Sequence, residues 1–374
     1  MKPEQSSNNP QAVATRIGIV GAGQLGRMLA LSGYPLGLKF IFLDNSKDAP
    51  GGQIGDIILG EFSDAKKITE LAGKCDILTY DVENVPVGAL AGIPKGKPFL
   101  PPPSALAAGQ DRLSEKNLFR ELRIPTPAFR AIESMPELEE AIQKIGYPAV
   151  LKTRRLGYDG RGQRFIRSPA ELGSAYNALA GVPLILEEFI AFEREVSIIG
   201  VRNLQGDTVF YPLAENRHRD GILRLSIAPY PDRKLQSQAQ TYAKRIMQHF
   251  DYAGVLTIEF FVRKGKLIAN ETAPRVHNSG HWTIEGAVTS QFENHLRGIL
   301  GLPLGDTSAV GYSAMVNFIG EMPRLADVLK IPGAHYHDYG KDARPNRKLG
   351  HATLACKTRK ELLSRLKKFP GLDR

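Results

Sequence analysis

The sequence is poor in cysteine and lacks long apolar runs. Cys75 and Cys356 are the only two cysteines among 374 residues, too few for a disulfide scaffold or for a structural zinc site with four cysteine ligands. The mean hydropathy is −0.22, and the absence of a stretch of about 20 apolar residues excludes a membrane-spanning helix. Residues 1–15 lack the apolar segment of a secretory signal and are rich in Ser, Asn, Gln and Pro. We therefore expect a cytoplasmic protein with a disordered N-terminal tail.

What the sequence does contain is the composition of an ordinary globular protein. Hydrophobic residues make up 42% and charged residues 24% of the chain, and the length predicts two or three domains. The net charge is +10, and residues 341–374 hold eleven Lys and Arg against three Asp and Glu. The positive surplus therefore lies mostly near the C-terminus. Such a charge permits nucleic acid as a partner, but it also suits small anionic substrates.

Strand-like and helical segments alternate at the start of the chain. The apolar segments Arg16–Val20, Phe40–Leu43, Ile57–Leu59 and Asp76–Tyr80 are predicted strands, and Leu25–Leu31 has helical spacing. This order is typical of βαβ units and predicts a parallel sheet.

Proline-rich and polar segments divide the rest of the chain. Ile93–Pro103 carries five prolines and is a predicted linker, so a second unit begins near Gln110, and a further boundary falls at Leu302–Gly311. A final amphipathic helix is predicted over Lys357–Phe369. The strands predicted inside the second unit are Ala149–Thr153, Leu184–Phe189, Val196–Val201 and Val209–Ala214.

The first chemical motif is a glycine fingerprint. Gly21–Gly26 (Gly-Ala-Gly-Gln-Leu-Gly) follows the first strand, and its glycines let the backbone of a helix N-terminus approach a phosphate. Asp44 ends the next strand, where a ribose-binding acid of a dinucleotide fold would lie. Taken alone, the motif favours a nicotinamide enzyme, and its alternative is a tight turn without a ligand.

The second motif is a lysine followed by a glycine-rich loop. Lys152 lies near the end of a buried strand, which is costly unless the ammonium faces an anion. Gly157–Gln163 (Gly-Tyr-Asp-Gly-Arg-Gly-Gln) follows at once and contains Arg161, while Arg154 and Arg155 precede it. Backbone amides and cations together predict a lid over a triphosphate, although the spacing is not that of a Walker A loop.

The third motif is an apolar strand that runs into acids. Leu184–Ile190 contains Glu187 and Glu188, and Glu195 follows. The backbone there is suited to an adenine edge, and the carboxylates are suited to amino or ribose hydroxyl groups. A strand that enters a solvated acidic turn explains this segment equally well.

The fourth motif is a hairpin with two facing acids. Val255–Val262 and Leu267–Thr272 are predicted antiparallel strands, and a hairpin centred on Gly265 places Glu259 opposite Glu271. Facing like charges are destabilising, so the pair requires a cation or a shared proton. Oxygen ligands beside phosphate-binding elements indicate Mg²⁺, and Asn270 is a further oxygen donor. The alternative is a register slip that sends one glutamate to solvent.

The fifth motif is the polar loop after that hairpin. Arg275 and His277 are suited to hydrogen bonds with a bound anion. His277 and His281 have the spacing of a zinc helix, but Asn-Ser-Gly between them breaks helices, so we do not predict zinc there. His335 and His337 are predicted surface residues.

Together these segments resemble the ATP-grasp superfamily, and within it the N5-carboxyaminoimidazole ribonucleotide synthases of purine biosynthesis. The resemblance runs from about Arg16 to His351, and its most specific part is Asn278-Ser279-Gly280-His281-Trp282. Asp81-Val82, before Glu83, departs from the pattern expected of the family. The segments that carry the resemblance are Gly21–Gly26, Glu83–Pro86, Gly157–Gln163, Glu215–His218, Asn270–Trp282 and Arg347–His351.

The resemblance implies an α/β and α+β architecture: an ATP-grasp fold with an N-terminal Rossmann-like (pre-ATP-grasp) domain and a small C-terminal domain. We expect the tail to span 1–15, the Rossmann-like domain 16–108, the ATP-grasp domain 109–303 with a mobile subdomain near 126–186, and the C-terminal domain 304–374. It further implies that ATP, bicarbonate and 5-aminoimidazole ribonucleotide give N5-carboxyaminoimidazole ribonucleotide, ADP and phosphate through carboxyphosphate. The expected cofactors are ATP and Mg²⁺, and the expected assembly is a homodimer without nucleic-acid or membrane partners.

The resemblance also assigns roles to individual residues. Mg²⁺ would be held by Glu259 and Glu271. The residues expected at ATP are Arg112, Lys152, Gly157, Tyr158, Asp159, Gly160, Arg161, Gly162, Gln163, Glu187, Glu188, Phe189, Ile190, Glu195, His218, Asn270 and Glu271. Those expected at the ribonucleotide are Gln24, Leu25, Glu83, Asn84, Asn278, Ser279, Lys341, Arg347 and Lys348. Those expected in the reaction itself are Tyr158, Arg161, Arg275, His277 and Lys348.

Three rival functions stay open at this point. A nicotinamide oxidoreductase would use Gly21–Gly26 and Asp44, but it leaves Lys152, the glycine-rich loop and the facing glutamates unexplained. A sister ATP-grasp enzyme, such as a formate-using transformylase, is closer. A basic nucleic-acid-binding module is the alternative outside enzymes.

Overall fold

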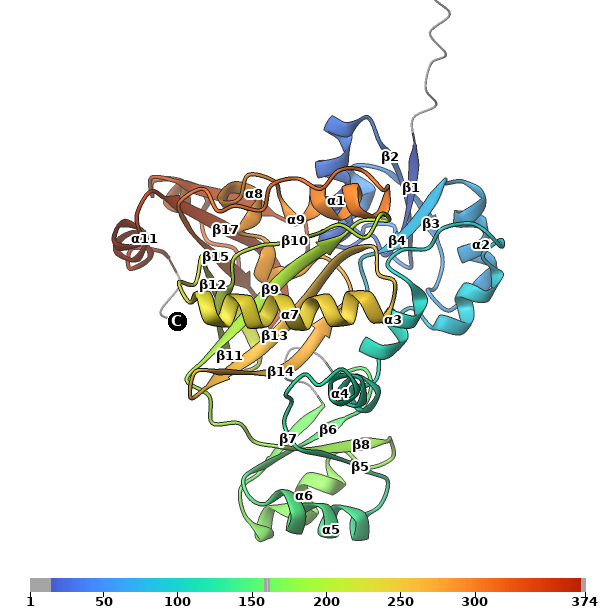
Figure 1. The fold of residues 1–374 in the computed structure, drawn as a ribbon. Coiled ribbons are helices and arrows are strands. Elements are labelled where there is room, and N and C mark those ends of the chain that lie inside the picture. Colours follow the sequence, from blue (N-terminus) through green and yellow to red (C-terminus); the bar gives the residue numbers. More distant parts are fainter. Residues whose placement is uncertain (1–14, 158–159, 161, 371–374) are drawn as a thin grey trace, which may run out of the picture.

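The computed structural model describes residues 15–157, 160 and 162–370. The expected lid residues Tyr158, Asp159 and Arg161 lie outside this set. Among the described residues the strands form three sheets, a parallel N-terminal one, a large central one and a small antiparallel one (Figure 1).

The N-terminal sheet is parallel and is covered by helices on both faces, as the βαβ pattern predicts. Ile17 and Ile19 pack against α1 (Gln24–Gly33), whereas Val20 packs with Ile68 and Leu71 of α2 (Ala65–Gly73). A sheet buried on both faces accounts for the continuous apolar runs of its strands. In spatial order these strands are β3 (Asp56–Leu59), β2 (Lys39–Asp44), β1 (Arg16–Val20) and β4 (Ile77–Tyr80).

The central sheet has two differently used faces. On β13 (Gly254–Arg263), Ile258, Phe260 and Val262 pack in one cluster with α7 (Arg233–His249), and the residues between them point to the opposite face. In spatial order its strands are β14 (Lys266–Ala273), β13, β9 (Arg194–Arg202), β11 (Ala214–Arg219), β12 (Ile222–Ala228), β15 (Tyr312–Ile319), β17 (Lys348–Cys356) and β16 (Ala334–Asp338), with β10 (Thr208–Phe210) also paired to β9.

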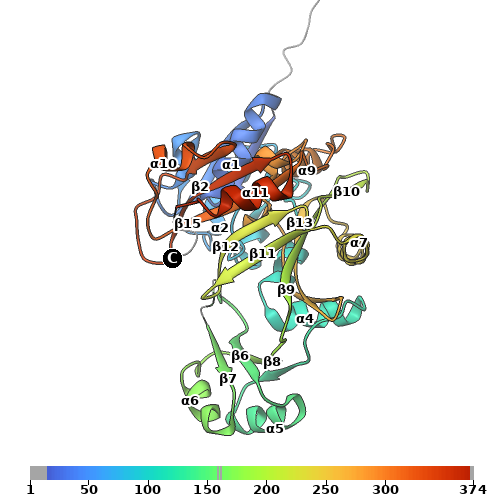
Figure 2. The ribbon, with the colours of Figure 1, turned by 90° about the vertical axis from the view of Figure 1, so that its left-hand side faces the viewer.

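The third sheet forms a separate layer that projects away from the central sheet (Figure 1, Figure 2). Its strands, in order, are β5 (Phe129–Ile132), β8 (Leu184–Glu188), β6 (Ala149–Thr153) and β7 (Gln163–Ile166). Its core is shared with α5 (Met135–Ile145) and α6 (Leu172–Asn177). The remaining α-helices are α3 (Pro103–Gly109), α4 (Arg112–Glu121), α8 (Thr283–Gly286), α9 (Gln291–Ile299), α10 (Leu325–Leu329) and α11 (Arg359–Leu366). Within the described part of the chain, none of the helices is long and apolar enough to cross a membrane.

Two predicted elements differ from the structure. Val209–Ala214 is not one strand, because Tyr211-Pro212-Leu213 separates β10 from β11, and proline cannot donate to a sheet ladder. The last helix is shorter than predicted and begins at Arg359, where the hydroxyl of Thr358 accepts the N–H of Glu361 as a cap.

Candidate functional site

The hairpin of β13 and β14 carries the two facing acids. Its two-residue turn is Lys264-Gly265, both with positive φ (50° and 66°), so the turn is centred one half-residue earlier than predicted. Regular pairing from that turn reaches Phe260 opposite Ala269. The register then shifts by one, and Glu259 lies opposite Glu271. The predicted pairing is therefore confirmed, but it arises from a β-bulge at Asn270 and not from the turn.

The two glutamates have different electrostatic surroundings. Burial raises the pKa of Glu259, the charge of His218 lowers it, and the neighbouring carboxylate of Glu271 raises it, so that the pKa of Glu259 is about 7. Burial also acts on Glu271, but Arg112, 3.4 Å away, and Lys152 keep the pKa of Glu271 below its usual range. Removing the repulsion between such neighbours is what a divalent cation does.

Lysines from two elements converge on Glu187. Glu187 Oε2 lies 2.9 Å from Lys152 Nζ on β6 and 3.6 Å from Lys116 Nζ on α4. Burial opposes ionisation, but both ammonium groups lower the pKa of Glu187 to about 2. A solvated acidic turn is thus wrong for Glu187, which is 2% exposed. Its Oε1 has no hydrogen-bond partner among the described residues, so a donor group of a ligand has an acceptor here.

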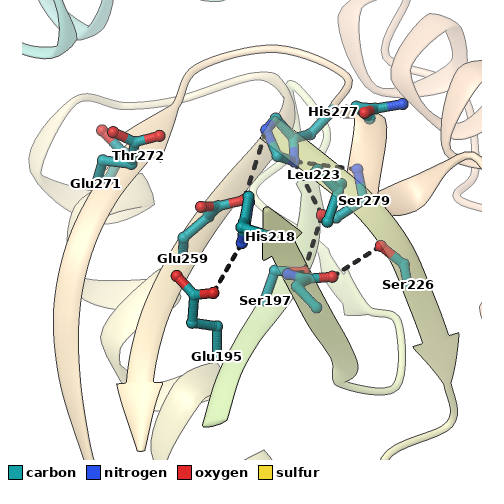
Figure 3. Close-up of polar contacts among 12 residues, drawn as sticks. Glu195, Ser197, His218, Leu223, Ser226, Glu259, Glu271, Thr272, His277 and Ser279 are labelled. Carbon is teal, nitrogen blue, oxygen red and sulfur yellow. Dashed lines mark hydrogen bonds and ion pairs between the residues drawn. The ribbon is translucent and has the colours of Figure 1, made fainter. Parts of the chain in front are cut away.

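His218 and Glu195 form the next pair on the same face of the central sheet (Figure 3). His218 Nδ1 lies 2.8 Å from Glu195 Oε2. Burial lowers the pKa of His218, but the hydrogen bond to Glu195 and the charge of Glu259 outweigh it and raise the pKa to about 9. His218 is therefore a cation at neutral pH, beside the glutamate pair.

The glycine-rich loop begins beside these groups. Arg112 Nη2 donates to Gly157 O at 3.1 Å, and Thr153 N donates to Gly162 O at 2.8 Å. The two arginines before the loop have another partner, because Arg154 and Arg155 both pair with Asp111, at 2.8 and 3.2 Å. Asp111 caps α4, so these arginines fix the start of the loop to that helix.

Three residues of the expected ATP segment follow β8 or lie on its end. Glu188 pairs with Arg263 at 3.3 Å. Phe189 is 36% exposed and meets Phe165 edge-on, whereas Ile190 is buried. Gln163 lies on β7 opposite Lys152.

A buried chain of hydrogen bonds fixes the ring of His277 (Figure 3). The N–H of Ser279 donates to His277 Nδ1 at 3.3 Å, and the Ser279 hydroxyl contacts the same nitrogen at 2.8 Å. Because Nδ1 accepts a backbone N–H, Nε2 carries the ring proton, and Nε2 lies 3.8 Å from Glu259 Oε1. Burial, and then the charges of Arg275 and Lys348, lower the pKa of His277 well below its usual range. His277 is thus a neutral hydrogen-bond donor toward the acids.

That chain continues away from the site. Ser197 Oγ donates to Ser279 Oγ at 2.8 Å, Asn216 Nδ2 donates to Ser197 Oγ at 3.0 Å, and Ser226 Oγ donates to Asn216 Oδ1 at 2.8 Å. Asn278 is held separately, by paired amide hydrogen bonds to Asn317 of 3.0 and 2.6 Å. The loop after β14 is therefore fixed on two strands of the central sheet.

Arg275 joins the central sheet to the N-terminal one. Arg275 Nη2 lies 2.8 Å from Glu83 Oε1, and Asn84 beside Glu83 is exposed. Burial raises the pKa of Glu83, while Arg275 lowers it. Arg275 Nε is buried without a hydrogen bond among the described residues.

The glycine fingerprint uses many of its N–H groups internally. Gly21 N donates to Leu43 O, Ala22 N to Asp44 Oδ2 and Gly26 N to Asp81 Oδ2, at 2.8, 2.8 and 3.0 Å. Asp44 therefore caps the turn and does not face a ribose. Asp81 is buried beneath the turn, where a Cβ on Gly21 would come within 1.7 Å of Asp81 Oδ1. The backbone N–H groups of the first helical residues, Gln24 and Leu25, are not used by these contacts and can bind a ligand.

Cations from the C-terminal segment reach this turn. Lys341 Nζ contacts Gln24 Oε1. Burial, and then the charge of Arg347, lower the pKa of Lys341 to about 8, and Lys348 acts in the same direction. Lys341 thus lies at Gln24, and the charges of Arg347 and Lys348 act on its ammonium group.

The donor set at Glu259 and Glu271 is suited to Mg²⁺. Among the described residues no group of three or more His, Cys, Asp or Glu could hold a metal ion. Two carboxylates with lysine and arginine nearby agree with the usual Mg²⁺ site, in which phosphate oxygens and water complete the ligands. Nδ1 of His277 accepts the backbone N–H of Ser279 and so is not available as a metal ligand.

Sequence reasoning missed several residues of this region. Lys116 is 1% exposed, and Asp81 and Asp111 are buried beneath the ligand-facing loops. The signal that could have found them is a lysine or aspartate on an apolar helix face or at a strand end, since such residues are rarely buried without partners. His337 was expected on the surface, but it stacks on His351 at 4.3 Å between ring centroids and contacts Glu285 at 2.8 Å.

Three family models match successive parts of the chain. An ATP-grasp domain matches residues 117–292, and a ribonucleotide synthetase preATP-grasp domain matches residues 14–110. A phosphoribosylaminoimidazole carboxylase C-terminal domain matches residues 313–365.

Individual relatives match nearly the whole chain. N5-carboxyaminoimidazole ribonucleotide synthase of Pseudomonas aeruginosa is 48% identical over 96% of this chain and 99% of its own. The crystal structure of N5-carboxyaminoimidazole ribonucleotide synthetase from Thermus thermophilus matches with a TM-score of 0.90 and 53% identity, over 94% of this chain and 97% of that one. The synthase of Aspergillus clavatus, solved with ADP and 5-aminoimidazole ribonucleotide, matches with a TM-score of 0.90 and 31% identity, over 96% and 99% of the two chains.

Proposed function

The chain belongs to the family of N5-carboxyaminoimidazole ribonucleotide synthases, with an ATP-grasp fold between a preATP-grasp domain and a small C-terminal domain, and from this premise we propose its reaction and the roles of its residues. The protein is an ATP-dependent ligase of purine biosynthesis. It joins bicarbonate to 5-aminoimidazole ribonucleotide and gives N5-carboxyaminoimidazole ribonucleotide, ADP and phosphate.

The observation that carries this proposal is the arrangement around Glu259. Glu271 faces it across the hairpin, and the charge of Lys152 acts on Glu271. His277 Nε2 lies 3.8 Å from Glu259, and the charge of Arg275 acts on His277. Phosphate-binding and anion-orienting groups therefore flank one pair of acids. Such an arrangement suits transfer of a phosphoryl group to a small anion.

ATP binding is proposed for the basic and glycine-rich side. Lys152 and Arg112 face the phosphates, and Gly157, Gly160, Gly162 and Gln163 cover them together with Tyr158, Asp159 and Arg161. The base is bound by Glu187, Glu188, Phe189 and Ile190. The ribose is bordered by Glu195 and His218. Mg²⁺, held by Glu259 and Glu271 with Asn270 beside them, neutralises phosphate charge when it is bound.

Bicarbonate is a poor electrophile until it is phosphorylated. A bicarbonate oxygen attacks the γ-phosphorus, the bond to the β-phosphate oxygen breaks, and carboxyphosphate and ADP form. The C–O bond of carboxyphosphate then breaks with phosphate as the leaving group, either when the substrate amine attacks the carboxyl carbon or before it, with release of CO₂ that the amine attacks. The proton lost by the amine passes to the phosphate. Arg275, together with Tyr158 and Arg161, holds the anion, and the Nε2–H of His277 donates to its oxygens. Exclusion of water protects the labile intermediate.

The ribonucleotide is proposed to lie between the glycine fingerprint and the C-terminal segment. Glu83 and Asn84 face its imidazole end, with Asn278 and Ser279 on the opposite side. The N–H groups of Gln24 and Leu25 and the cations Lys341, Arg347 and Lys348 bind its phosphate. We further propose a homodimer that acts in the cytoplasm, with domain boundaries at 16–108, 109–303 and 304–374 and a mobile subdomain near 126–186.

An ADP-release assay with direct detection of the product tests this proposal. ADP formation should require bicarbonate and increase with 5-aminoimidazole ribonucleotide, and the N5-carboxylated product should appear with it. ATP turnover without that product would overturn the proposal. Replacing bicarbonate by formate separates it from a formate-using transformylase.

A further inference from the structure

The bulge in β14 decides which way Glu271 points. Phe260 pairs with Ala269 and Glu259 pairs with Glu271, so Asn270 is the extra residue between two regular stretches of ladder. Two residues of the bulged strand then oppose one residue of its partner. Asn270 and Glu271 are both presented to Glu259 by this means.

Without the bulge the same hairpin would bury Glu271. Regular pairing beyond Ala269 would place Asn270 opposite Glu259 and Glu271 opposite Ile258. Ile258 belongs to the apolar layer beneath α7, together with Leu267 and Ala269. A one-residue change of register moves a side chain to the other face of its sheet, so the carboxylate would leave the face on which Glu259 lies.

Two adjacent residues of α4 hold the backbone on either side of Glu271. Lys116 Nζ donates to the carbonyl of the bulged residue, Asn270, at 2.6 Å. Glu115 Oε1 accepts both the N–H and the hydroxyl of Thr272, at 2.6 and 2.7 Å. Both side chains are buried, at 1% and 2% exposed. Buried charged groups are costly, and here their polar atoms are used on the backbone and side chain of residues next to Glu271.

The same helix reaches the other groups of the site. Lys116 Nζ also lies 3.6 Å from Glu187 on β8, and Arg112, one helical turn earlier, lies 3.4 Å from Glu271 itself. One face of α4 therefore contacts the bulge, the acid it presents and the strand that carries the proposed base-binding residues.

We propose that Glu115 and Lys116 are positioning residues for the metal, because they stabilise the bulged register that turns Glu271 into the site. This inference rests on the metal role proposed for Glu271. It assigns a function to two residues that would not touch the metal, and to a bulge that would otherwise be a local irregularity.

The decisive comparison is Glu115→Leu against Glu115→Gln. The glutamine amide oxygen still accepts from Thr272, whereas leucine removes the acceptor from a buried N–H and hydroxyl. Lys116→Met removes the donor to Asn270, and Lys97→Met is its matched control, because Lys97 donates to the carbonyl of Cys75 far from the site. Three quantities are measured: the melting temperature without ligands, amide hydrogen exchange of residues 266–273, and the Mg²⁺ concentration for half-maximal ADP release.

For Glu115→Leu and Lys116→Met we expect faster exchange in residues 266–273 and about a tenfold higher Mg²⁺ requirement, since each variant loses a buried hydrogen bond to the bulged strand. Glu115→Gln and Lys97→Met should keep wild-type values of both. An unchanged Mg²⁺ requirement and exchange in folded Glu115→Leu would overturn the inference.

Two further outcomes also test the inference. If Glu115→Leu does not fold, Thr272→Val removes only the hydroxyl contact, and it should raise the Mg²⁺ requirement about threefold; no change there overturns the inference as well. If the wild-type protein makes no carboxylated product, the proposed function fails. The Mg²⁺–ATP-dependent melting temperature and the hydrogen exchange of residues 266–273 still show whether Glu115 and Lys116 stabilise the bulge.

Discussion

The backbone N–H of Ser279 donates to Nδ1 of His277, and the other ring nitrogen, Nε2, lies 3.8 Å from Glu259. The ring is therefore a donor at Nε2. A glutamine side chain places its NH₂ near the position of Nε2, whereas the shorter asparagine resembles the Nδ1 side. His277→Gln should consequently retain more activity than His277→Asn, by about tenfold, the value of one charge-assisted hydrogen bond.

Nitrogen chemical shifts of the wild-type ring check the same assignment. They should show a neutral Nε2–H tautomer from pH 6 to 8, because burial lowers the pKa of His277 well below its usual range. An imidazolium in this range, or equal activity of the two variants, would contradict it.

Glu271→Gln should fold and lose Mg²⁺-dependent turnover. Removing the charge of Glu271 relieves its repulsion with Glu259, but it also ends the ion pair with Arg112, which together with Lys152 keeps the pKa of Glu271 below its usual range. We expect the melting temperature without ligands to fall slightly, and the increase in melting temperature on adding Mg²⁺–ATP to disappear. Wild-type activity in this variant would show that Glu271 is not a metal ligand.

The pair of His218 and Glu195 predicts a pH-dependent part of the stability. The pKa of His218 is raised to about 9 in the folded protein, above the usual value of about 6.5. Its stabilisation is therefore fully present below about pH 6.5 and is lost as the pH rises through 9. The upper bound is about 3 kcal/mol, from 1.36 kcal/mol per pKa unit.

Denaturant unfolding of wild type and His218→Gln from pH 5.5 to 9.5 measures this contribution. The difference in unfolding free energy should be largest at the acidic end and should shrink toward pH 9. A difference that grows with pH would contradict the raised pKa.

Strand and helix periodicity predicted most of the fold, because buried strands and amphipathic helices leave a local signal. Arg16–Val20 and Ala149–Thr153 have the predicted bounds. The failure at Val209–Ala214 has a local cause as well, since Pro212 interrupts an otherwise strand-like run. Strand-like periodicity alone does not show that an apolar segment is interrupted by a turn of the folded chain.

The site was predictable in its residue types but not in its connections. The facing of Glu259 and Glu271 was predicted, yet the bulge that produces it depends on Lys116 and Glu115, more than 140 positions earlier in the chain. The pairing of Arg154 with Asp111 likewise joins residues 43 positions apart, beside a backbone hydrogen bond from Arg112 N to Arg154 O. Contacts of this range have no spacing in the sequence that indicates them.

Arg347 provides the test of the proposed phosphate site. Arg347 is half-buried, and its Nη1 donates to Asp342 O at 3.1 Å. Its charge acts on Lys341, which contacts Gln24 at the start of α1. Loss of one charge-assisted contact to phosphate costs roughly 1.5–3 kcal/mol. Arg347→Ala should therefore raise the KM for the ribonucleotide by about tenfold or more, while the KM for ATP stays near the wild-type value.

Lys360→Ala is the matched control for Arg347→Ala, because Lys360 is an exposed cation of α11 in the same basic segment. It should change neither KM. Both constants come from initial rates of ADP release with one substrate varied at a time. An equal rise of both in Arg347→Ala would indicate a general loss of active-site structure. Tight, salt-dependent binding of DNA by the wild-type protein, weakened equally by either substitution, would place the basic segment on nucleic acid. A rise confined to the ribonucleotide is the result that assigns Arg347 to its phosphate.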